Sequence, residues 1–238
     1  MAIYRLPEEP VFPPPDEAEE DGLLAVGGDL TPERLLLAYS QGIFPWPHQG
    51  WPMLWFSPDP RMVLLPHEIK LQRSLRQTIK KQRFEIRLDT AFARVMEGCK
   101  GTRRPGQKGT WITKGIIKAY VALHELGFAH SAEAWLEDEL VGGLYGISLG
   151  RAFFGESMYA TVDDASKVAF AALVAQLARW KFDFIDAQVH TPHLERFGAK
   201  LIPRAEYLQR LEATLKQPAL RGPWKLDAPL CQPGEAHP

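Results

Sequence analysis

The stretch GGLYGISLGRAFFGESMY, residues 142–159, decides the fold of this chain. Apolar and aromatic residues fill it, but five glycines interrupt it and Glu156 lies near its end. Glycine weakens a strand and marks a bulge or a close approach to the backbone. The stretch therefore predicts a hairpin that lines a cleft, with strands over 144–148 and 151–157 and its turn at Leu149-Gly150. Glu156 is either a carboxylate of that cleft or an ordinary surface carboxylate at a strand end.

The segments around this hairpin predict a mixed sheet. Strands over 129–136, 139–148 and 151–157 follow one another with short turns, as in an antiparallel meander. A helix is expected next, capped by Asp163 or Asp164 and ending near Trp180, and then a strand over 182–189. Because a strand, a crossover helix and a strand form a parallel, right-handed unit, we expect the last strand to lie beside 151–157.

Polar residues recur along this last strand, FDFIDAQVH. Alternation places Asp186 and Gln188 on one face, about 7 Å apart at roughly 3.3 Å per residue. Polar side chains on a mostly apolar strand need partners, because burying them alone is costly. The sequence therefore predicts an acidic pocket shared by Glu156, Asp186 and Gln188, and a purely structural hydrogen-bond network is the alternative.

The first 61 residues form a separate small domain in this interpretation, and 62–238 the second domain. The acidic, proline-rich segment 1–21 predicts an extended arm without a core. A strand over 23–26 and a helix from Pro32 to Gly42, capped by Thr31, follow. The aromatic residues after this helix form either a small core or a platform on which an unpaired nucleobase stacks; they include Trp46, Trp51, Trp55 and Phe56.

Basic residues cluster in the next segment, although the net charge of the chain is only −1. These basic residues are Lys70, Arg73, Arg76, Lys80, Lys81 and Arg83. On a predicted helix they lie opposite an apolar stripe of Leu71, Leu75 and Ile79. A second basic segment, KGTRRPGQKG, covers residues 100–109. A solvated helix face is the simpler alternative, but two such segments favour a phosphate backbone as partner.

The remaining helices are expected over 89–98, 113–127, 191–198 and 203–215, followed by a loosely held tail over 217–238. His124 and His130 are six positions apart, which is too far for a helical zinc pair, so we expect no metal. The two cysteines, Cys99 and Cys231, predict neither a disulfide framework nor a metal site. The sequence contains no dinucleotide-binding or P-loop motif. It also contains no apolar run of membrane-spanning length and no signal peptide, so we expect a cytoplasmic location.

Several blocks of the chain together resemble the leucyl/phenylalanyl-tRNA–protein transferase family along roughly residues 22–215. These blocks are GLLAVGGDLTPERLL, AYSQGIFPWP, WFSPDPR, TWIT, AYVALHELGFAHSAEAW, ELVGGLYGISLGRAFFGESMY, ASK and IDAQV. The resemblance implies an α+β fold, with a small N-terminal α/β domain and a second domain like the GCN5-related N-acetyltransferases, whose mixed sheet is flanked by helices. It implies an enzyme that moves Leu, Phe or, less readily, Met from aminoacyl-tRNA to proteins that begin with Arg or Lys. Such products are marked for degradation, and no cofactor, metal or membrane is implied; we expect a monomer.

The resemblance also implies roles for individual residues. Asp186 and Gln188 match the family's proposed catalytic pair, with Glu156 in the same cleft. We expect the Gln188 carbonyl to orient the incoming amine and Asp186 to fix the amide through its NH2 group. The aminoacyl group and its adenosine would contact Leu144, Phe153, Ser157, Met158, Trp46 and Trp111, and the cations at 70–83 would hold the tRNA. Leu144 stands where Met is expected, which affects the shape of the pocket and not the reaction.

Two other functions compete with this interpretation. An N-acetyltransferase that uses acetyl-CoA is disfavoured, because ATVDDASK, residues 160–167, has acidic residues where a pyrophosphate would bind. A tRNA-binding protein without catalysis is disfavoured by the presence of Glu156, Asp186 and Gln188.

Overall fold

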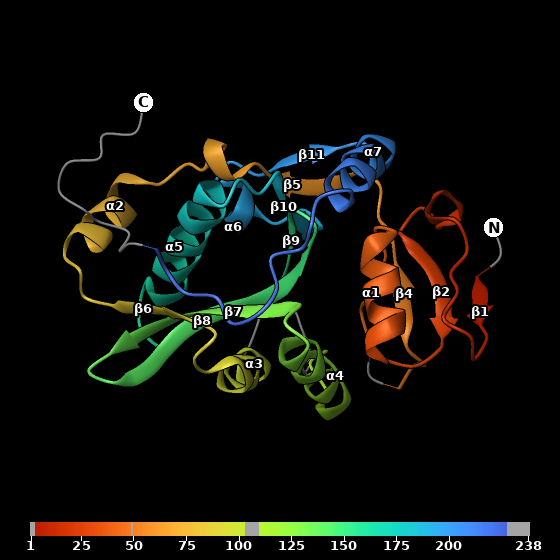
Figure 1. The fold of residues 1–238 in the computed structure, drawn as a ribbon, viewed down its shortest axis with the longest axis horizontal. Helices are drawn as coiled ribbons and strands as arrows, with labels where there is room; N and C mark the ends of the chain where they lie inside the picture. Colours follow the sequence, from red (N-terminus) through yellow and green to blue (C-terminus); the bar gives the residue numbers. More distant parts are fainter. Residues whose placement is uncertain (1–2, 49, 103–109, 228–238) are drawn as a thin grey trace.

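Two sheets organise the chain in this computed structural model, which describes residues 3–48, 50–102 and 110–227. The first sheet has the order β1-β2-β4-β3, built from Tyr4–Leu6, Leu23–Gly27, Leu54–Phe56 and Phe44–Pro45. The second has the order β11-β5-β10-β9-β8-β7-β6. Its strands are β5 (Arg61–Leu64), β6 (Glu85–Leu88), β7 (Ala129–Leu136), β8 (Glu139–Leu149), β9 (Ala152–Ala160), β10 (Phe184–Gln188) and β11 (Lys200–Ile202). Helices accompany both sheets, so the chain has the expected α+β character (Figure 1).

Helices cover both faces of the larger sheet (Figure 1). The helices of the described residues are α1 (Pro32–Ser40), which lies beside the first sheet, and α2 (Arg73–Lys80), α3 (Phe92–Gly101), α4 (Lys114–Glu125), α5 (Ala165–Arg179), α6 (Pro192–Glu195) and α7 (Arg204–Leu215), with 3-10 turns at Pro15–Glu17 and Pro66–Glu68. Thr31, Thr113 and Thr191 cap their helices through their side chains, and the Thr31 cap was expected from the sequence. Alternation along β8 sends Tyr145 into the core beside α3 and α4, and Leu144 into the core beside α5.

The predicted meander and crossover are both confirmed. Strands β7, β8 and β9 pair antiparallel, and β10 pairs parallel with β9 after the α5 crossover. The hairpin turns at Gly150, whose φ of +56° is accessible to glycine. Gly146 lies at a β-bulge, where an added Cβ atom would stand 2.2 Å from the carbonyl oxygen of Phe154. A glycine is therefore needed where β8 and β9 approach.

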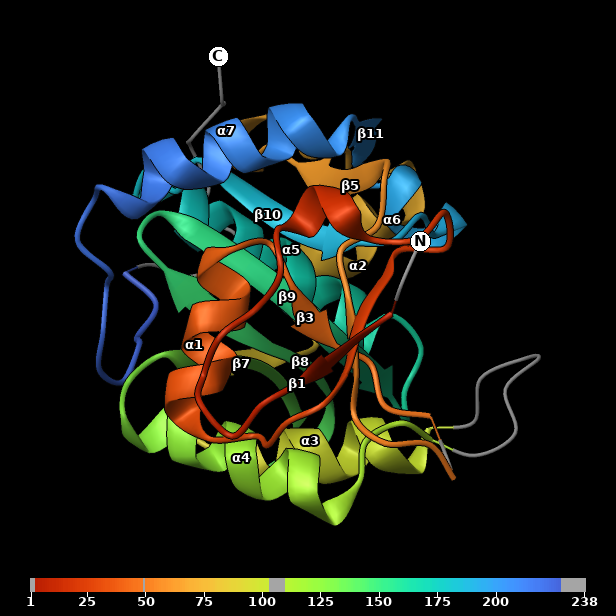
Figure 2. The ribbon, with the colours of Figure 1, turned by 90° about the vertical axis from the view of Figure 1, so that its right-hand side faces the viewer.

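The core of the first sheet is continuous with the core of the second. Leu35, Tyr39 and Trp55 belong to the same buried cluster as Tyr120 and Phe154. Figure 2 shows α1 between α7 and α4, and α1 contacts both helices. The N-terminal segment thereby supplies side chains to the interior of the larger unit.

The N-terminal arm has no core of its own and packs on the first sheet. Strand β1 pairs parallel with β2, and Leu6 is buried. The buried guanidinium of Arg34 donates to the carbonyl oxygens of Pro7 (3.0 Å) and Glu8 (2.7 Å), and Phe12 lies edge-on to Trp55. Arg34 and Trp55, which lie further along the chain, thus hold the N-terminal arm, although the arm has no apolar pattern of its own.

The start of α3 and the tail differ from prediction. The helix expected over 89–98 does not begin at Asp89, whose carboxylate accepts from the backbone N–H groups of Ser131 and Trp224. Glu133 accepts from the N–H groups of Thr90 and Ala91, just before α3. The helix continues through Gly98 to Gly101, and Gly98 lies directly against the Tyr159 ring. In the tail, buried Trp224 stacks on His130 at 3.6 Å, so residues 217–227 are not loosely held. Cys231 and most of the basic segment at 100–109 lie outside the described residues.

Candidate active site

A cavity of about 440 Å³ opens where β9 and β10 separate. The two strands pair only from Ala152 to Phe154 and from Phe184 to Asp186. Beyond this point each strand exposes its backbone and side chains to the space between them. The lining residues come from both sheets and from α5 and α6; they include Phe44, Trp46, Trp111, Leu144, Glu156, Ser157, Met158, Phe170, Asp186, Gln188 and His193.

Glu156 receives hydrogen bonds from three uncharged groups at one end of this cavity. Oε1 accepts from the Tyr39 hydroxyl and the Gln188 amide, each at 2.7 Å, and Oε2 accepts from the Tyr120 hydroxyl at 3.3 Å. Burial raises the pKa of Glu156 to about 7 against the opposing effect of these hydrogen bonds. Glu156 is therefore not a surface carboxylate, and it changes charge close to neutral pH.

The two tyrosines come from different parts of the chain. Tyr39 lies on α1 and Tyr120 on α4, and their hydroxyl oxygens are 2.5 Å apart. Burial, followed by the nearby Glu156 charge, raises the pKa of both hydroxyls well above its usual value, so both remain protonated donors. Sequence patterns place each of these rings on the apolar face of its helix. Nothing in the neighbouring residues indicates that the two hydroxyls meet at one carboxylate.

Asp186 has surroundings of the opposite kind, because it is fully buried against a cation. Arg61 donates to both carboxylate oxygens, from Nε at 2.9 Å and from Nη2 at 2.7 Å. Tyr207 donates its hydroxyl to Oδ2 at 2.8 Å. The Arg61 guanidinium lies between the rings of Phe44 and Tyr207 and also donates to the Gly42 carbonyl. The bidentate pair fixes Asp186 in one orientation.

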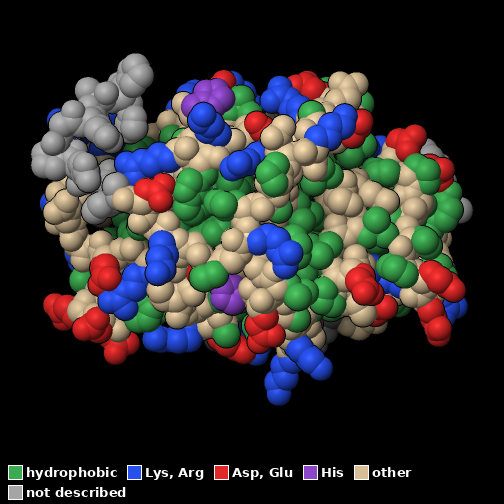
Figure 3. All heavy atoms as spheres, viewed as in Figure 1, with side chains coloured by type: hydrophobic (Ala, Val, Ile, Leu, Met, Phe, Trp, Pro, Cys, Tyr) green, Lys and Arg blue, Asp and Glu red, His purple; other side chains and the backbone are tan. Residues whose placement is uncertain are grey.

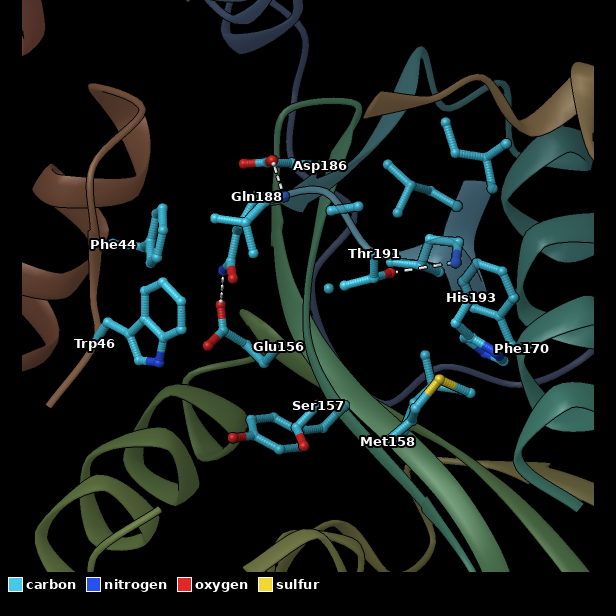
Figure 4. A pocket seen from close by; sticks show the side chains of 18 of the residues that line it. Phe44, Trp46, Glu156, Ser157, Met158, Phe170, Asp186, Gln188, Thr191 and His193 are labelled. Atoms are coloured by element: carbon cyan, nitrogen blue, oxygen red, sulfur yellow. Dashed lines mark hydrogen bonds between the residues drawn. The ribbon is translucent and has the colours of Figure 1, made fainter. Parts of the chain in front are cut away.

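Gln188 connects the two carboxylates, although in a different way from the one expected. The strand bulges here and Gln188 has a φ of +62°. Its backbone N–H donates to Asp186 Oδ1 at 2.8 Å, and its side-chain NH2 donates to Glu156 (Figure 4). The prediction that Asp186 holds the side-chain amide is therefore wrong, because Arg61 and Tyr207 already occupy its carboxylate.

Aromatic rings lie at the same end of the cavity as Glu156 and Gln188 (Figure 4). Trp46 packs edge-on against Phe56 at 5.5 Å and near Phe44 at 6.3 Å, which fixes its ring. Trp111 lines the same cavity just before α4. Trp55, in contrast, is fully buried. For this residue the small core, one of the two alternatives considered for these aromatic residues, is therefore the correct one.

The other end of the cavity is apolar. Leu144, Met158 and Phe170 line it, with Ser157 also in the wall. Phe153 is not among the lining residues and the prediction for it is corrected: it lies where β9 is still paired with β10, and its ring packs against Gly146 and Trp224. The reason is that the strands separate only after this position.

His193 ends the apolar wall and was not singled out by the sequence. The ring packs edge-on against Phe197 at 5.3 Å, and Nε2 is buried without a hydrogen-bond partner among the described residues. Burial, together with the charges of Arg196 and Lys167, lowers the pKa of His193. The imidazole is therefore neutral where it meets the cavity.

Comparison with known proteins supplies the family. The family model for "Leucyl/phenylalanyl-tRNA protein transferase" matches residues 63–212, and that for the N-terminal domain of the same transferase matches residues 28–59. The chain belongs to the leucyl/phenylalanyl-tRNA–protein transferase family. It is accordingly an enzyme of the transferase class.

Close relatives carry the family name along nearly their whole length. The leucyl/phenylalanyl-tRNA–protein transferase of Anaeromyxobacter sp. (strain Fw109-5) is 60% identical over 96% of this chain and 97% of that protein. The transferase of Myxococcus xanthus (strain DK1622) is 56% identical over 94% of this chain and 97% of its own. A solved structure, a conserved protein of unknown function from Staphylococcus epidermidis ATCC 12228, aligns at 10% identity with a TM-score of 0.43, over 76% of this chain and 68% of that one. That likeness is too low to carry an argument.

The basic residues expected to hold tRNA lie on the surface of this family member. Helix α2 buries Leu75 and Ile79, as predicted, whereas Leu71 precedes the helix and is half-buried. The exposed cations around it are Lys70, Arg73, Arg76, Lys80, Lys81 and Arg83. Figure 3 shows one face of the molecule, on which Lys and Arg are interspersed with Asp and Glu.

Metal ligands do not gather anywhere among the described residues: no three His, Cys, Asp or Glu side chains are placed to hold an ion. His130 Nδ1 contacts Asp89, and His124 Nδ1 contacts the Ala129 carbonyl. Among the helices that the structure describes, none combines the length and apolar character needed to cross a bilayer.

Proposed function

We propose that this transferase moves Leu, Phe and, less readily, Met from aminoacyl-tRNA to the α-amino group of proteins that begin with Arg or Lys, marking them for N-degron degradation. The observation that carries the proposal is a single cavity with an apolar wall at one end and tryptophans, Glu156 and Gln188 at the other. An aminoacyl ester offers the same sequence of groups: an apolar side chain, a reactive carbonyl and a nucleoside.

The donor binds with its side chain towards Leu144, Met158 and Phe170 in this proposal. Unbranched and γ-branched side chains suit such a wall, which discriminates by only about 1–3 kcal/mol per methylene. Trp46 and Trp111 supply flat faces on which the terminal adenine stacks. Exposed cations on α2 contact phosphates of the tRNA, because cations on one face of a helix favour contact with a phosphate backbone.

The amine of the acceptor protein attacks the ester carbon next to Gln188. The Gln188 NH2 is engaged with Glu156, so its carbonyl oxygen is the atom that remains to accept a hydrogen bond from the amine. A nitrogen–carbon bond forms and the bond from that carbon to the ribose oxygen breaks. Because the ester is already activated, orienting the two reactants supplies most of what the reaction needs, with no cofactor in the proposal.

Glu156 accepts the proton that the amine loses and returns one to the ribose oxygen. Its pKa of about 7 suits both transfers at neutral pH, since a base works best near the ambient pH. In its ionised form it also attracts the cationic side chain of an N-terminal Arg or Lys. Asp186 is a positioning residue in this scheme, because Arg61 and Tyr207 hold its oxygens and its link to Gln188 is through the backbone.

The proposal includes the division of the chain into 1–61 and 62–238, with a GCN5-related fold in the second part. The parallel pair β9 and β10, which separates around the cavity, supports this relationship. Arg61, the first residue of β5, lies at the junction and reaches into the site. Action as a cytoplasmic monomer is also part of the proposal, and sedimentation with and without tRNA tests the oligomeric state.

Transfer of labelled Phe from Phe-tRNA to an Arg-initiated peptide tests this function. The matched control is the same peptide with an acetylated N-terminus, which has no free amine and should remain unlabelled. Mass spectrometry should show one Phe added before Arg. Label that remains on tRNA or in free Phe would favour a tRNA-binding protein without catalysis, whereas calorimetric binding of acetyl-CoA would favour an N-acetyltransferase.

A further inference from the structure

A second cavity, of about 240 Å³, lies behind the apolar end of the first. Most of its lining residues are polar or charged, and they include Lys70, Gln72, Ser74, Asp164, Lys167 and Arg196. Several of these side chains, such as Gln72 and Arg196, are exposed at the surface. The second cavity is therefore a polar hollow that faces solvent, whereas the adjoining end of the first cavity is apolar.

His193 forms part of the wall between the two cavities, because it lines both of them. Of the two cavities, Phe170 lines the first and Phe197 the second. The ring of Phe197 packs edge-on against His193, with 5.3 Å between centroids, and against Phe170, at 4.9 Å. Three rings in contact thus separate the cavities. In Figure 4, His193 and Phe170 lie at the opposite end of the first cavity from Trp46.

Neighbouring residues in the chain fix the position of this wall. His193 is in α6, and the Thr191 side chain caps that helix by accepting from the Leu194 N–H at 3.2 Å. The Thr191 N–H in turn donates to Met62 Sδ at 3.4 Å. Helix α6 follows directly after β10, which ends at Gln188. The short segment 188–193 therefore sets how far the wall stands from the reacting end of the first cavity.

The imidazole of His193 brings no charge into the wall. Burial, followed by the charges of Arg196 and Lys167, lowers the pKa of His193, so the ring is neutral at neutral pH. Its Nε2 atom is buried without a partner among the described residues, which means that neither cavity reaches this nitrogen. A hydroxyl pressed against the wall from the first cavity would lose water without gaining Nε2 as a partner, and this is unfavourable.

We propose that His193 is a specificity-determining residue, whose ring ends the side-chain pocket so that a Phe side chain fits and the longer side chain of Tyr does not. The inference rests on the proposed function, which places the donor side chain against Leu144, Met158 and Phe170, and it adds the residue that limits the length of that side chain. Without the ring, the pocket opens into the second cavity, where polar groups and solvent suit a phenolic hydroxyl.

One tRNA charged chemically with either Phe or Tyr tests this role, because the two donors then differ by a single hydroxyl. In His193→Ala, the ratio of kcat/KM for the Tyr donor to that for the Phe donor should rise at least about tenfold, the size of effect expected from one small group in an apolar pocket. His193→Phe restores a ring and should keep the wild-type ratio. Ser74→Ala is the matched control and should also keep it, because Ser74 lines only the second of the two cavities.

Competition between the two donors in one reaction makes the ratio independent of the fraction of enzyme that is folded. Binding of amide-linked analogues of phenylalanyl-adenosine and tyrosyl-adenosine, which do not react, adds a readout that catalysis does not affect. Of these variants, His193→Ala alone should gain affinity for the tyrosyl analogue relative to the phenylalanyl analogue.

Three results would overturn the role of His193. They are an unchanged ratio in His193→Ala, a wild type that uses the Tyr donor as well as the Phe donor, and an equal gain for Tyr in His193→Phe, which would assign the discrimination to the ring nitrogens and not to size. In each of these cases transfer of Phe by the wild type leaves the proposed function standing. A wild type that transfers neither Leu nor Phe would overturn the proposed function itself.

Discussion

Two carboxylates lie in the same cleft of this transferase, and their surroundings differ in one respect. Asp186 is buried against the guanidinium of Arg61, whereas Glu156 has only uncharged donors around it. Arg61 therefore offsets the charge of Asp186 within the interior. No such cation among the described residues offsets the charge of Glu156, so burial raises its pKa to about 7.

This difference assigns different work to the two residues. A carboxylate held by a bidentate arginine is fixed in one orientation and serves to hold geometry. A carboxylate that ionises near pH 7 can accept and return a proton. The family resemblance places Asp186 in the catalytic pair, and in the proposed reaction its contacts with Arg61 and Tyr207 make it a positioning residue.

Removal of Arg61 should give the largest effect, because it leaves Asp186, like Glu156, without a cation beside its carboxylate. Arg61→Met leaves Asp186 as a buried charge without its partner and should lower the free energy of unfolding by about 3–5 kcal/mol. Urea denaturation measures this loss. The double variant Arg61→Met/Asp186→Leu should recover part of it, and a single variant as stable as the wild type would contradict the importance given to the ion pair.

Glu156→Gln should leave the fold in place and lower kcat by about 10²- to 10⁴-fold, the usual contribution of a general base. In the wild type, kcat should rise with pH through about 7, because Glu156 must lose its proton to act as a base. This rise should disappear in the variant. Glu212→Gln, on the exposed end of α7, is the matched control and should keep the wild-type profile. A pH profile of Glu156→Gln that still rises through 7 would assign the proton to another group.

Tyr39→Phe sharpens the same comparison with a smaller change. The Tyr39 hydroxyl stabilises the ionised form of Glu156, so its loss should raise the pKa of Glu156 further. Loss of one hydrogen bond worth roughly 1 kcal/mol should lower the ionised fraction of Glu156 at pH 7, and with it the activity, by about threefold, and the activity should recover at higher pH. Steady-state rates between pH 6 and 9 measure this shift. A uniform loss at every pH would instead indicate damage to packing.

A substitution at the apolar end of the cavity should have the smallest effect on stability and transfer, since no charge is involved there. Leu144→Met conserves volume approximately and should cost less than about 1.5 kcal/mol in stability. The ratio of kcat/KM for Leu-tRNA to that for Phe-tRNA should change by less than about tenfold. Competition between the two donors measures this ratio. A large loss of transfer with both donors would show that Leu144 affects the reacting end as well.

Local patterns were sufficient to predict the β7 to β9 meander, the α5 crossover and the parallel placement of β10. Period-two alternation and turn residues act over a few positions, so they are visible in the sequence. The same patterns brought Glu156 and Gln188 to one cleft. They failed at the Gln188 bulge and at the start of α3, because contacts from Glu156 and Glu133 decide the conformation there.

The partners of the site residues could not be predicted in this way. Arg61 and Asp186 are separated by 125 positions, and Tyr39 and Glu156 by 117. In the sequence, Arg61 ends a proline-rich loop and Tyr39 is one apolar residue of a helix. Nothing in either pattern indicates which carboxylate it will contact.

The sequence by itself determined the central strands and helices of the larger sheet and brought Glu156, Asp186 and Gln188 to one cleft, because the patterns involved act over a few neighbouring residues. Only the tertiary structure decided that Arg61 lies against Asp186 while Glu156 receives hydrogen bonds from uncharged groups alone. The reason is physical: the charge state of a buried carboxylate depends on which groups surround it in space, and here those groups come from α1, α4, β5 and α7.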